Sequence, residues 1–311
     1  MISVLGAGVA GLCAATTLAE RGMDVEVVMP DDAPQAASAL AGGMLAPFCE
    51  GESAPSCIVT RGQASLGWWA DRSQTFAARG TLVVAPPRDA AELDRFASVT
   101  RAHRWVTPVD LEPDLEGRFA RGLFFPDEAH LDPREALSTL RDRLVTRGVR
   151  FVRTAQGRRI VDCRGLAAAD QLNDLRPVRG EMLEILAPGV TLSRPVRLLH
   201  PRFPCYIVPR GGGRYMIGAT MIETSRPGGI TARAAMELLS AAYALHPAFA
   251  EGEILSTGAG HRPAFPDNIP ALRRIGDRFH LNGMYRHGFL MAPVLAMDLA
   301  KLLQTELAHA H

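Results

Sequence analysis

The chain has 311 residues, of which 47% are hydrophobic and 22% charged, as in an ordinary globular protein. Its 34 basic and 33 acidic residues give a net charge of +1 without a basic block, which argues against a nucleic-acid groove. No run of 18 apolar residues suggests a membrane-spanning helix. The start of the chain lacks a secretory-signal pattern, and its five cysteines are scattered without a C-x-x-C pair. We therefore expect a cytoplasmic protein with reduced thiols and no metal site.

The first thirty residues predict a strand, a glycine-rich turn, a helix and a second strand. Residues 2–5 and 25–28 are short apolar runs, as in parallel strands that are buried on both faces. Between them, Gly6, Gly8 and Gly11 form a G-x-G-x-x-G motif. In this motif the first glycine permits a tight turn, the second lets a pyrophosphate approach, and the third lets helix and strand pack closely. Because the motif follows a strand and opens a helix, it predicts dinucleotide binding.

The end of the second strand departs from the usual dinucleotide-binding pattern. Met29 stands where an acidic residue would bind the ribose hydroxyls. Asp31 and Asp32 follow closely, and either one of these carboxylates or backbone and water would hold the ribose. No basic residue is present to bind a 2′-phosphate, so we expect an adenine dinucleotide without one.

Three later segments carry local structural signals. Asp132 is the expected N-cap of a helix that starts at Pro133, with Glu135 placed for a capping box. The segments "CYIVPR" and "RYMIGAT" flank three glycines, which predicts a β-hairpin beginning near Tyr206. "GAGHRPAFPDN" is too rich in glycine and proline for a helix and is expected to be a tight loop that holds Arg262. From composition alone, Tyr206 would be packing and Arg262 would face solvent.

Several segments, in order along nearly the whole chain, resemble the glycine oxidases of thiamine biosynthesis, within the D-amino-acid oxidase and sarcosine oxidase group of FAD-dependent amine oxidases. They are "VLGAGVAGLCAATTLAERG", "AGGMLAPFCEGE", "GLFFPDEAHLDPREAL", "VRGEMLEI", "CYIVPRGGGRYMIGATMIE", "GAGHRPAFPDNIPALRRIG" and "NGMYRHGFLMAPVLA". The resemblance implies α/β plus α+β architecture, in which a Rossmann-like FAD-binding domain is interleaved with an antiparallel-sheet substrate domain. The expected FAD-binding segments are 1–66, 130–175 and 256–311, and the expected substrate-domain segments are 67–129 and 176–255.

The resemblance also implies FAD as the cofactor. Monomeric sarcosine oxidases attach their flavin to a cysteine near the C-terminus, whereas the last cysteine here is Cys205, so we expect non-covalent FAD. The backbone from Gly288 to Met291 would face the pyrimidine part of the isoalloxazine and stabilise negative charge there. The full set of expected cofactor contacts is Gly6, Gly8, Gly11, Asp31, Gly42, Gly43, Met44, Gly283, Gly288, Phe289, Leu290 and Met291.

Three residues are implied to serve the substrate. Arg262 would clamp its carboxylate, the phenol of Tyr206 would contact the same carboxylate, and Arg286 would lie over the amine and the flavin edge through its side chain or backbone. His261 and His287 are not expected to act as bases. The implied reaction is oxidative deamination of glycine or another small amino acid, by hydride transfer from Cα to flavin N5. Its products would be an imine or glyoxylate, ammonia and hydrogen peroxide.

Dioxygen is the expected electron acceptor, and the reaction would serve synthesis of the thiazole of thiamine. The alternatives are a sarcosine or D-amino-acid oxidase, a dehydrogenase of the same superfamily, or a non-catalytic FAD-binding subunit. The sequence leaves open whether the chain forms a homo-oligomer.

Overall fold

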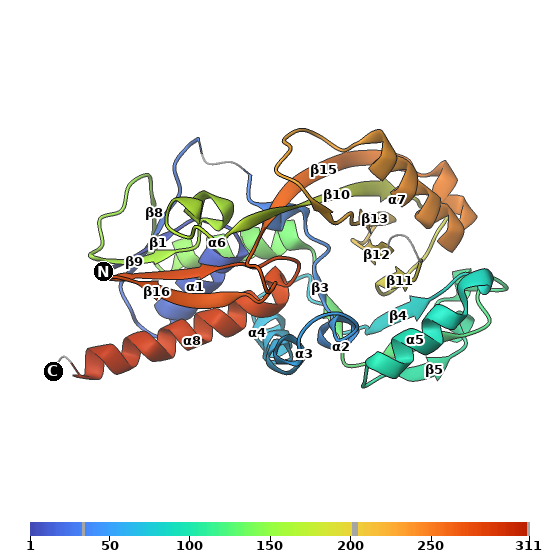
Figure 1. Cartoon of the computed structure of the whole chain (residues 1–311), viewed down its shortest axis with the longest axis horizontal. Coiled ribbons are helices and arrows are strands. Elements are labelled where there is room, and N and C mark those ends of the chain that lie inside the picture. The colour runs from blue at the N-terminus through green and yellow to red at the C-terminus, as the bar shows by residue number, and fades with distance from the viewer. Residues whose placement is uncertain (33–34, 201–204, 310–311) are drawn as a thin grey trace.

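The computed structural model describes residues 1–32, 35–200 and 205–309, which form two large β-sheets and one two-stranded sheet, with helices packed against them. Figure 1 shows the two sheets in opposite halves of an elongated molecule, with both ends of the chain in the same half. Two long strands, β10 (Arg176–Leu186) and β15 (Glu253–Ala264), lie along the upper side and extend from one half towards the other (Figure 1).

The first sheet has six strands and carries the predicted N-terminal unit. β1 lies near its centre, between β2 and β9, and the register pairs Ile2 with both Val25 and Arg159. Four of the five pairings are parallel, and only the edge strand β16 runs antiparallel to its neighbour β17. In spatial order the strands are β16 (Ala271–Ile275), β17 (Arg278–Asn282), β9 (Arg159–Asp162), β1 (Ile2–Leu5), β2 (Val25–Val28) and β8 (Arg150–Val152).

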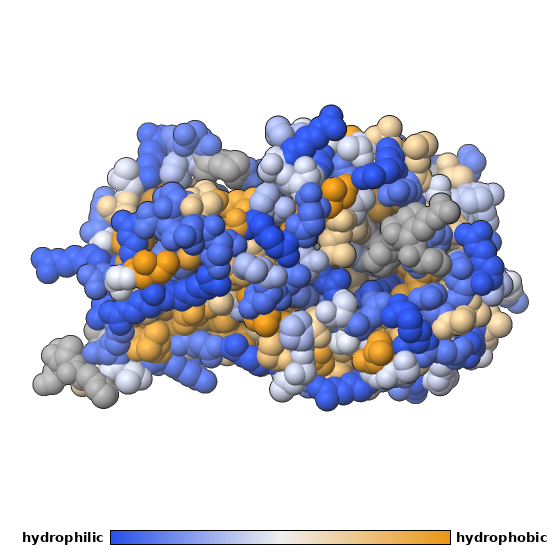
Figure 2. All heavy atoms as spheres, in the orientation of Figure 1, coloured by the Kyte–Doolittle hydropathy of each residue, from blue (hydrophilic) through white to orange (hydrophobic). Residues whose placement is uncertain are grey.

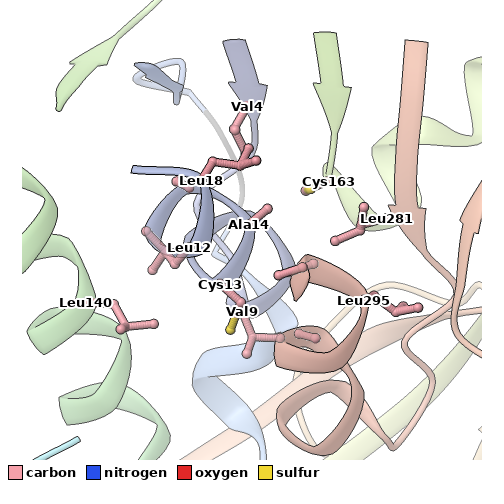
Figure 3. Close-up of a cluster of buried hydrophobic side chains, with 14 of the residues drawn as sticks. Val4, Val9, Leu12, Cys13, Ala14, Leu18, Leu140, Cys163, Leu281 and Leu295 are labelled. Atoms are coloured by element: carbon pink, nitrogen blue, oxygen red, sulfur yellow. The ribbon is translucent and has the colours of Figure 1, made fainter. Parts of the chain in front are cut away.

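Helix α1 (Val9–Glu20) is the centre of the main hydrophobic core. Its first ten residues are all buried, because it lies between the six-stranded sheet and two further helices. Figure 3 shows α1 surrounded by Leu140 from α6 (Pro133–Thr146), Leu295 from α8 (Gly288–His309) and Leu281 from β17. Burial of this apolar surface, at about 25 cal/mol per Å², fixes α1 and the glycine turn that precedes it.

The second sheet has nine strands and forms the other half of the molecule (Figure 1). It is antiparallel except where β11 pairs with β4. Helix α7 (Ala232–Leu245) packs on one part of it, and α5 (Ala91–Val99) packs next to β6. The other strands are β4 (Thr81–Val84), β5 (Arg104–Val106), β6 (Gly122–Phe125), β11 (Val196–Leu198), β12 (Cys205–Pro209), β13 (Arg214–Gly218) and β14 (Ile222–Glu223).

Short elements connect the two halves. The strands β3 (Met44–Leu45) and β7 (Ala129–His130) form a two-stranded sheet of their own. Three helices follow β3 along the chain. The second and third of them pack against α8. They are α2 (Pro47–Glu50), α3 (Ser56–Gly62) and α4 (Ala64–Ala70).

Helix α8 is long and apolar enough over Gly288–Glu306 to cross a membrane by length and composition. However, 61% of that window is buried, because α8 packs on α1, α4 and the six-stranded sheet. This is how a core helix of the fold behaves. Hydrophilic residues cover most of the face shown in Figure 2, with hydrophobic residues visible between them, as on most folded proteins.

Two local predictions need correction. "GAGHRPA" is not a loop but the end of β15, in which Gly258 and Gly260 are extended and pack under Leu40. Asp132 caps α6 as predicted, but its own N–H donates to Thr75 rather than to Glu135, so the capping box is incomplete. Residues 288–291, which are expected to face the flavin, form the first turn of α8.

The strand pairings support a discontinuous FAD-binding domain. The six-stranded sheet combines residues 2–28 with residues 150–162 and 271–282. The expected boundary at residue 256 falls within β15, which pairs with β10 of the nine-stranded sheet along its length. We propose FAD-binding segments 1–66, 130–175 and 265–311, of which residues 310–311 lie outside the described part, and assign 67–129 and 176–264 to the substrate domain.

Candidate active site

The glycine turn after β1 has the geometry that a dinucleotide requires. Gly6 adopts φ +96°, a left-handed conformation that favours glycine, and a Cβ there would lie 2.8 Å from the carbonyl oxygen of Cys163. At Gly11 a Cβ would lie only 1.8 Å from the carbonyl oxygen of Gly6, so the turn packs directly on α1. The first and third glycines of the motif are therefore required by the fold itself.

The start of α1 presents N–H groups to a ligand. No side chain caps the helix at Gly8, and the N–H groups of the first helical turn have no acceptor within the helix. One of them, that of Val9, donates to the hydroxyl of Ser38 at 3.0 Å. A Cβ at Gly8 would meet that hydroxyl at 3.3 Å, so a side chain at residue 8 would crowd the helix N-terminus, where the helix dipole favours a pyrophosphate.

The N-terminus of α8 meets this turn. A Cβ on Gly288 would lie 3.2 Å from Val9 Cγ1, so the first turns of α1 and α8 are adjacent. Gly288, Phe289 and Leu290 precede the first intrahelical bonds, whereas the N–H of Met291 donates to the carbonyl of His287 at 2.7 Å. Two helix N-termini thus point their positive ends at one region, which fits a cofactor that carries a pyrophosphate and becomes negative on reduction.

The side chains of this first turn are held by neighbouring helices. The ring of Phe289 packs on Trp69, whose indole N–H donates to the Phe289 carbonyl at 2.8 Å. Leu290 fills the space over Gly62 of α3. Gly283, with φ +71°, lies under the ring of Phe265 just before this turn. The backbone of 288–291 is therefore rigidly placed.

Asp31 does not lie in this constellation. It is exposed after β2 and pairs with Arg153 at 2.6 Å, and both side chains are more than two-thirds exposed. Met29, by contrast, donates its backbone N–H to the carbonyl of Val152 and continues the sheet. The geometry thus gives Asp31 a surface ion pair, and a role for it at the ribose remains a proposal.

The segment 41–44 lies beneath Tyr206. A Cβ on Gly42 would lie 2.6 Å from the Tyr206 ring, and one on Gly43 would lie 2.2 Å from the carbonyl of Leu131. Met44 is half-buried in β3 and belongs to the core under α5. The two adjacent glycines therefore let the chain pass between the hairpin and α6.

Arg210, which the sequence reasoning missed, holds this segment in place. Its guanidinium donates to the carbonyls of Gly42 at 2.9 Å and Leu131 at 2.8 Å, and its side chain is only 5% exposed. Burial lowers the pKa of Arg210, while Asp132, at 3.8 Å, raises it. The only sequence signal for this residue is its position at the end of β12, at the start of the hairpin turn.

The phenol of Tyr206 is affected by the charges of both expected arginines. It lies in β12 opposite Gly218 of β13. Burial raises the pKa of the Tyr206 phenol, the charge of Arg262 lowers it, and the charges of Glu50 and Arg286 also act on it. The structure therefore brings Tyr206, Arg262 and Arg286 into one region, although they are far apart in sequence.

The two arginines differ in their partners. Arg286 pairs with Glu50 of α2 at 2.9 Å and also donates to Ser53. Arg262 donates to the carbonyl of Thr220 at 3.1 Å, and among the described residues it has no carboxylate partner within 4.0 Å. The site therefore contains one neutralised guanidinium and one whose charge is free for an anionic ligand.

A buried acid–base group surrounds Arg286. Glu50 lies 3.3 Å from the ring of His287, and burial raises the pKa of Glu50 but the charges of Arg286, His287 and Arg197 lower it below its ordinary value. Burial lowers the pKa of His287, which favours the neutral ring. Glu50 was not singled out in the sequence, because nothing local to α2 shows that it meets residue 286.

The turn that carries Arg286 is fastened to β15. The N–H of Tyr285 donates to the carbonyl of Pro263 at 2.8 Å, and Tyr285 adopts φ +46°. Upstream of this turn, the side chain of Asn282 donates to the carbonyl of Gly165 and accepts from the N–H of Gly283. These bonds connect Arg262, Arg286 and the N-terminus of α8 into one unit.

Fold and site together define a dinucleotide-binding protein. A family model described as "DAO: FAD dependent oxidoreductase" matches residues 1–302. The chain therefore belongs to this family, and FAD is its cofactor. The expected fold class and the resemblance to glycine oxidases are confirmed.

Individual relatives agree with this assignment. The chain is 51% identical over 316 residues to the "Putative thiamine biosynthesis oxidoreductase ThiO" of Rhizobium etli, across 98% of this chain and 97% of the relative. Crystal structures of glycine oxidase from Bacillus cereus and of iminodiacetate oxidase from Chelativorans sp. superpose with a TM-score of 0.82 each. Each is 22% identical and covers 98% of this chain and 95% of the other, so these structures support the fold. The chain is an enzyme of the glycine oxidase type.

Proposed function

We propose that this enzyme oxidatively deaminates glycine or another small amino acid and yields an imine or glyoxylate, ammonia and hydrogen peroxide. The observation that carries the proposal is the guanidinium of Arg262, which has no carboxylate partner within 4.0 Å among the described residues and whose charge lowers the pKa of the buried Tyr206 phenol. A planar guanidinium can form two parallel charge-assisted hydrogen bonds to a carboxylate, about twice as strong as neutral ones. A single free guanidinium suits a substrate with a single carboxylate.

The side chains around the substrate have distinct roles in this proposal. Arg262 clamps the carboxylate, and the Tyr206 phenol donates to the same group, because the raised pKa of Tyr206 keeps its proton in place. Arg286, neutralised by Glu50, fixes α2 over the site and presents its turn to the amine. The first N–H groups of α8 stabilise negative charge that develops beside them.

FAD, held at the N-termini of α1 and α8, would supply the redox chemistry: acceptance of a hydride from the substrate Cα, and transfer of two electrons, with two protons, to dioxygen to give hydrogen peroxide. The protein contributes orientation, which is worth up to about 7–11 kcal/mol when the reacting groups are held in place. His287 is buried beside Glu50, its pKa is lowered by burial, and the proposal assigns it no role as a base. The amine must bind in its neutral form, so activity should rise as pH rises towards the pKa of the substrate amine.

The context of the reaction is also proposed. The name of the Rhizobium etli relative supports a role in thiamine biosynthesis. We propose that the reaction serves synthesis of the thiazole, with the imine as the product that is used. We propose that the enzyme acts in the cytoplasm and binds FAD without a covalent link. Acid or heat denaturation should then release the yellow chromophore into the supernatant, and chromophore that stays with the precipitated chain would refute the non-covalent proposal.

A peroxide assay tests the function directly. The purified yellow holoenzyme is given glycine, sarcosine, iminodiacetate and small D-amino acids in air, and peroxide is measured together with ammonia or methylamine. We expect the highest kcat/KM for glycine and bleaching of the flavin under anaerobic glycine. A preference for sarcosine or D-alanine would replace glycine oxidase by one of the related oxidases. Anaerobic bleaching without peroxide formation in air would identify a dehydrogenase.

A further inference from the structure

The guanidinium of Arg262 lies directly over Gly180 in the neighbouring strand. β15 and β10 pair antiparallel, with Arg262 opposite Val178 and Gly260 opposite Gly180. A Cβ added at Gly180 would lie 2.2–2.5 Å from three atoms of the guanidinium. Gly180 does not have a positive φ, so its backbone would accept another residue. A Cβ at residue 180 would therefore displace the Arg262 guanidinium from the space that it occupies.

Thr220 supplies the polar contact that orients this guanidinium. Its carbonyl accepts from Arg262 Nη1 at 3.1 Å. Its hydroxyl accepts from the N–H of Glu181 at 2.9 Å and donates to the Glu181 carboxylate at 3.2 Å, and its own N–H donates to the Glu181 carbonyl at 3.2 Å. Three hydrogen bonds thus join Thr220 to Glu181.

Glu181 is itself fully buried and fixed from several sides. Its carboxylate accepts from Arg179 at 3.0 Å and from the N–H of Thr231 at 3.0 Å. Arg179, 3% exposed, also donates to the carbonyls of residues 226 and 228 at 2.9 and 3.0 Å. A buried ion pair contributes little net stability. We therefore interpret this fully hydrogen-bonded network as one that holds the residues around Glu181 in fixed positions.

We propose that Gly180, Glu181 and Thr220 form a positioning network that sets the orientation of the Arg262 guanidinium for the substrate carboxylate. The proposal rests on the proposed role of Arg262 as the carboxylate clamp. Gly180 provides the space, Glu181 holds Thr220, and the Thr220 carbonyl occupies one edge of the guanidinium. The remaining N–H groups of the guanidinium then face the ligand in one orientation. Two parallel hydrogen bonds to a carboxylate require such a fixed orientation.

The test measures carboxylate binding to the holoenzyme by isothermal titration with acetate. Thr220→Val keeps the shape of residue 220 but removes both hydroxyl hydrogen bonds to Glu181, and we expect it to raise the Kd for acetate roughly tenfold. Thr220→Ser retains the hydroxyl and is expected to keep the Kd within about twofold. Gly180→Ala displaces the guanidinium directly and should weaken acetate binding at least as much as Thr220→Val.

Thr231→Val is the matched control. The hydroxyl of Thr231 bonds to the same Glu181 carboxylate oxygen at 3.4 Å, but the residue caps α7 and does not contact Arg262. We expect Thr231→Val to lower the Tm while the Kd for acetate stays unchanged. An equal rise in Kd for Thr231→Val and Thr220→Val would show a general loosening of the fold and overturn the proposal.

Arg262→Lys separates this proposal from the function on which it rests. If Arg262→Lys leaves acetate binding unchanged, the clamp role fails. If Arg262→Lys weakens binding while Thr220→Val and Gly180→Ala do not, the clamp stands and the positioning network is refuted. In the double variant Arg262→Lys with Thr220→Val, the effects should be less than additive, because both changes act on the same hydrogen bonds.

Discussion

The glycine turn after β1 and the proposed substrate face of this enzyme are built in opposite ways. The turn consists of Gly6, Gly8 and Gly11, which lie within six residues of one another and are shaped by backbone contacts. The substrate face combines Glu50, Tyr206, Arg262 and Arg286 from α2, β12, β15 and the turn before α8. In the glycine turn, the spacing of the residues along the sequence determines the role of each one. On the proposed substrate face, the role of each residue depends on the side chain with which it pairs in space. Arg262 and Arg286 illustrate this, because the carboxylate of Glu50 pairs with Arg286, whereas Arg262 donates to the carbonyl of Thr220.

The largest expected effect comes from breaking the local region. Gly11→Ala would place a Cβ 1.8 Å from the backbone carbonyl of Gly6, which cannot move without separating α1 from β1. We expect a loss of stability of about 3 kcal/mol or more and little bound FAD. Urea unfolding and the flavin-to-protein absorbance ratio measure both effects. Gly67→Ala is the control, because Gly67 is exposed on α4 and its Cβ would meet nothing within 4 Å. In this variant the free energy of unfolding and the flavin-to-protein ratio should both stay near wild type.

A slightly smaller effect concerns the support of α2 on the substrate side. Glu128 is buried and accepts from the N–H of Cys49 at 2.7 Å; burial raises its pKa from 4.5 to about 7, although that hydrogen bond lowers it. Because the folded pKa exceeds the unfolded value, the folded state binds the extra proton between these values. The free energy of unfolding should therefore fall by about 3 kcal/mol as pH rises from 4.5 to 7, and stay low above it.

Glu128→Gln should remove this contribution, since the amide stays neutral and its oxygen can still accept from Cys49. Urea unfolding of the holoenzyme at pH 5 and pH 8 measures it. The variant should be more stable than wild type at pH 8 and lose less stability between the two pH values. Equal losses in the two proteins would show that Glu128 does not titrate with a raised pKa.

Arg262→Lys breaks the assembled region and leaves the local region intact. The protein should remain yellow, but kcat/KM for glycine should fall on the order of a hundredfold, about 2.7 kcal/mol of transition-state binding. Lysine keeps the charge but cannot form the two parallel bonds of a guanidinium. A variant that loses FAD would instead show that Arg262 supports the nucleotide region.

Glu50→Gln sharpens the contrast between the two arginines. Removing the carboxylate that neutralises Arg286 leaves a second free guanidinium near Arg262. We expect the ratio of kcat/KM for iminodiacetate to that for glycine to rise about tenfold, or 1.4 kcal/mol, because a second carboxylate gains a partner. An unchanged ratio would mean that Arg286 does not face the substrate.

The predictability of the molecule follows the same division. The β1–α1–β2 unit, the Asp132 cap and the hairpin at Tyr206 could be predicted, because local spacing and turn chemistry determine them. The strand identity of residues 258–264 could not, since the pairing with β10 outweighs the local preference of glycine and proline for turns. The roles of Arg210 and Glu50 depend on contacts between segments that are far apart in the sequence. Glu50 and Arg286, for example, are about 240 residues apart, and no local sequence pattern encodes their contact.

The most direct test of the central claim is the turnover of glycine by Arg262→Ala, measured on protein with a wild-type content of FAD. Our central proposal is that the guanidinium of Arg262, which has no carboxylate partner within 4.0 Å among the described residues, binds the substrate carboxylate. It predicts a fall in kcat/KM larger than that of Arg262→Lys, hence more than about a hundredfold, with the flavin spectrum unchanged. Near-normal turnover of glycine and other amino acids by this holoenzyme would contradict the account.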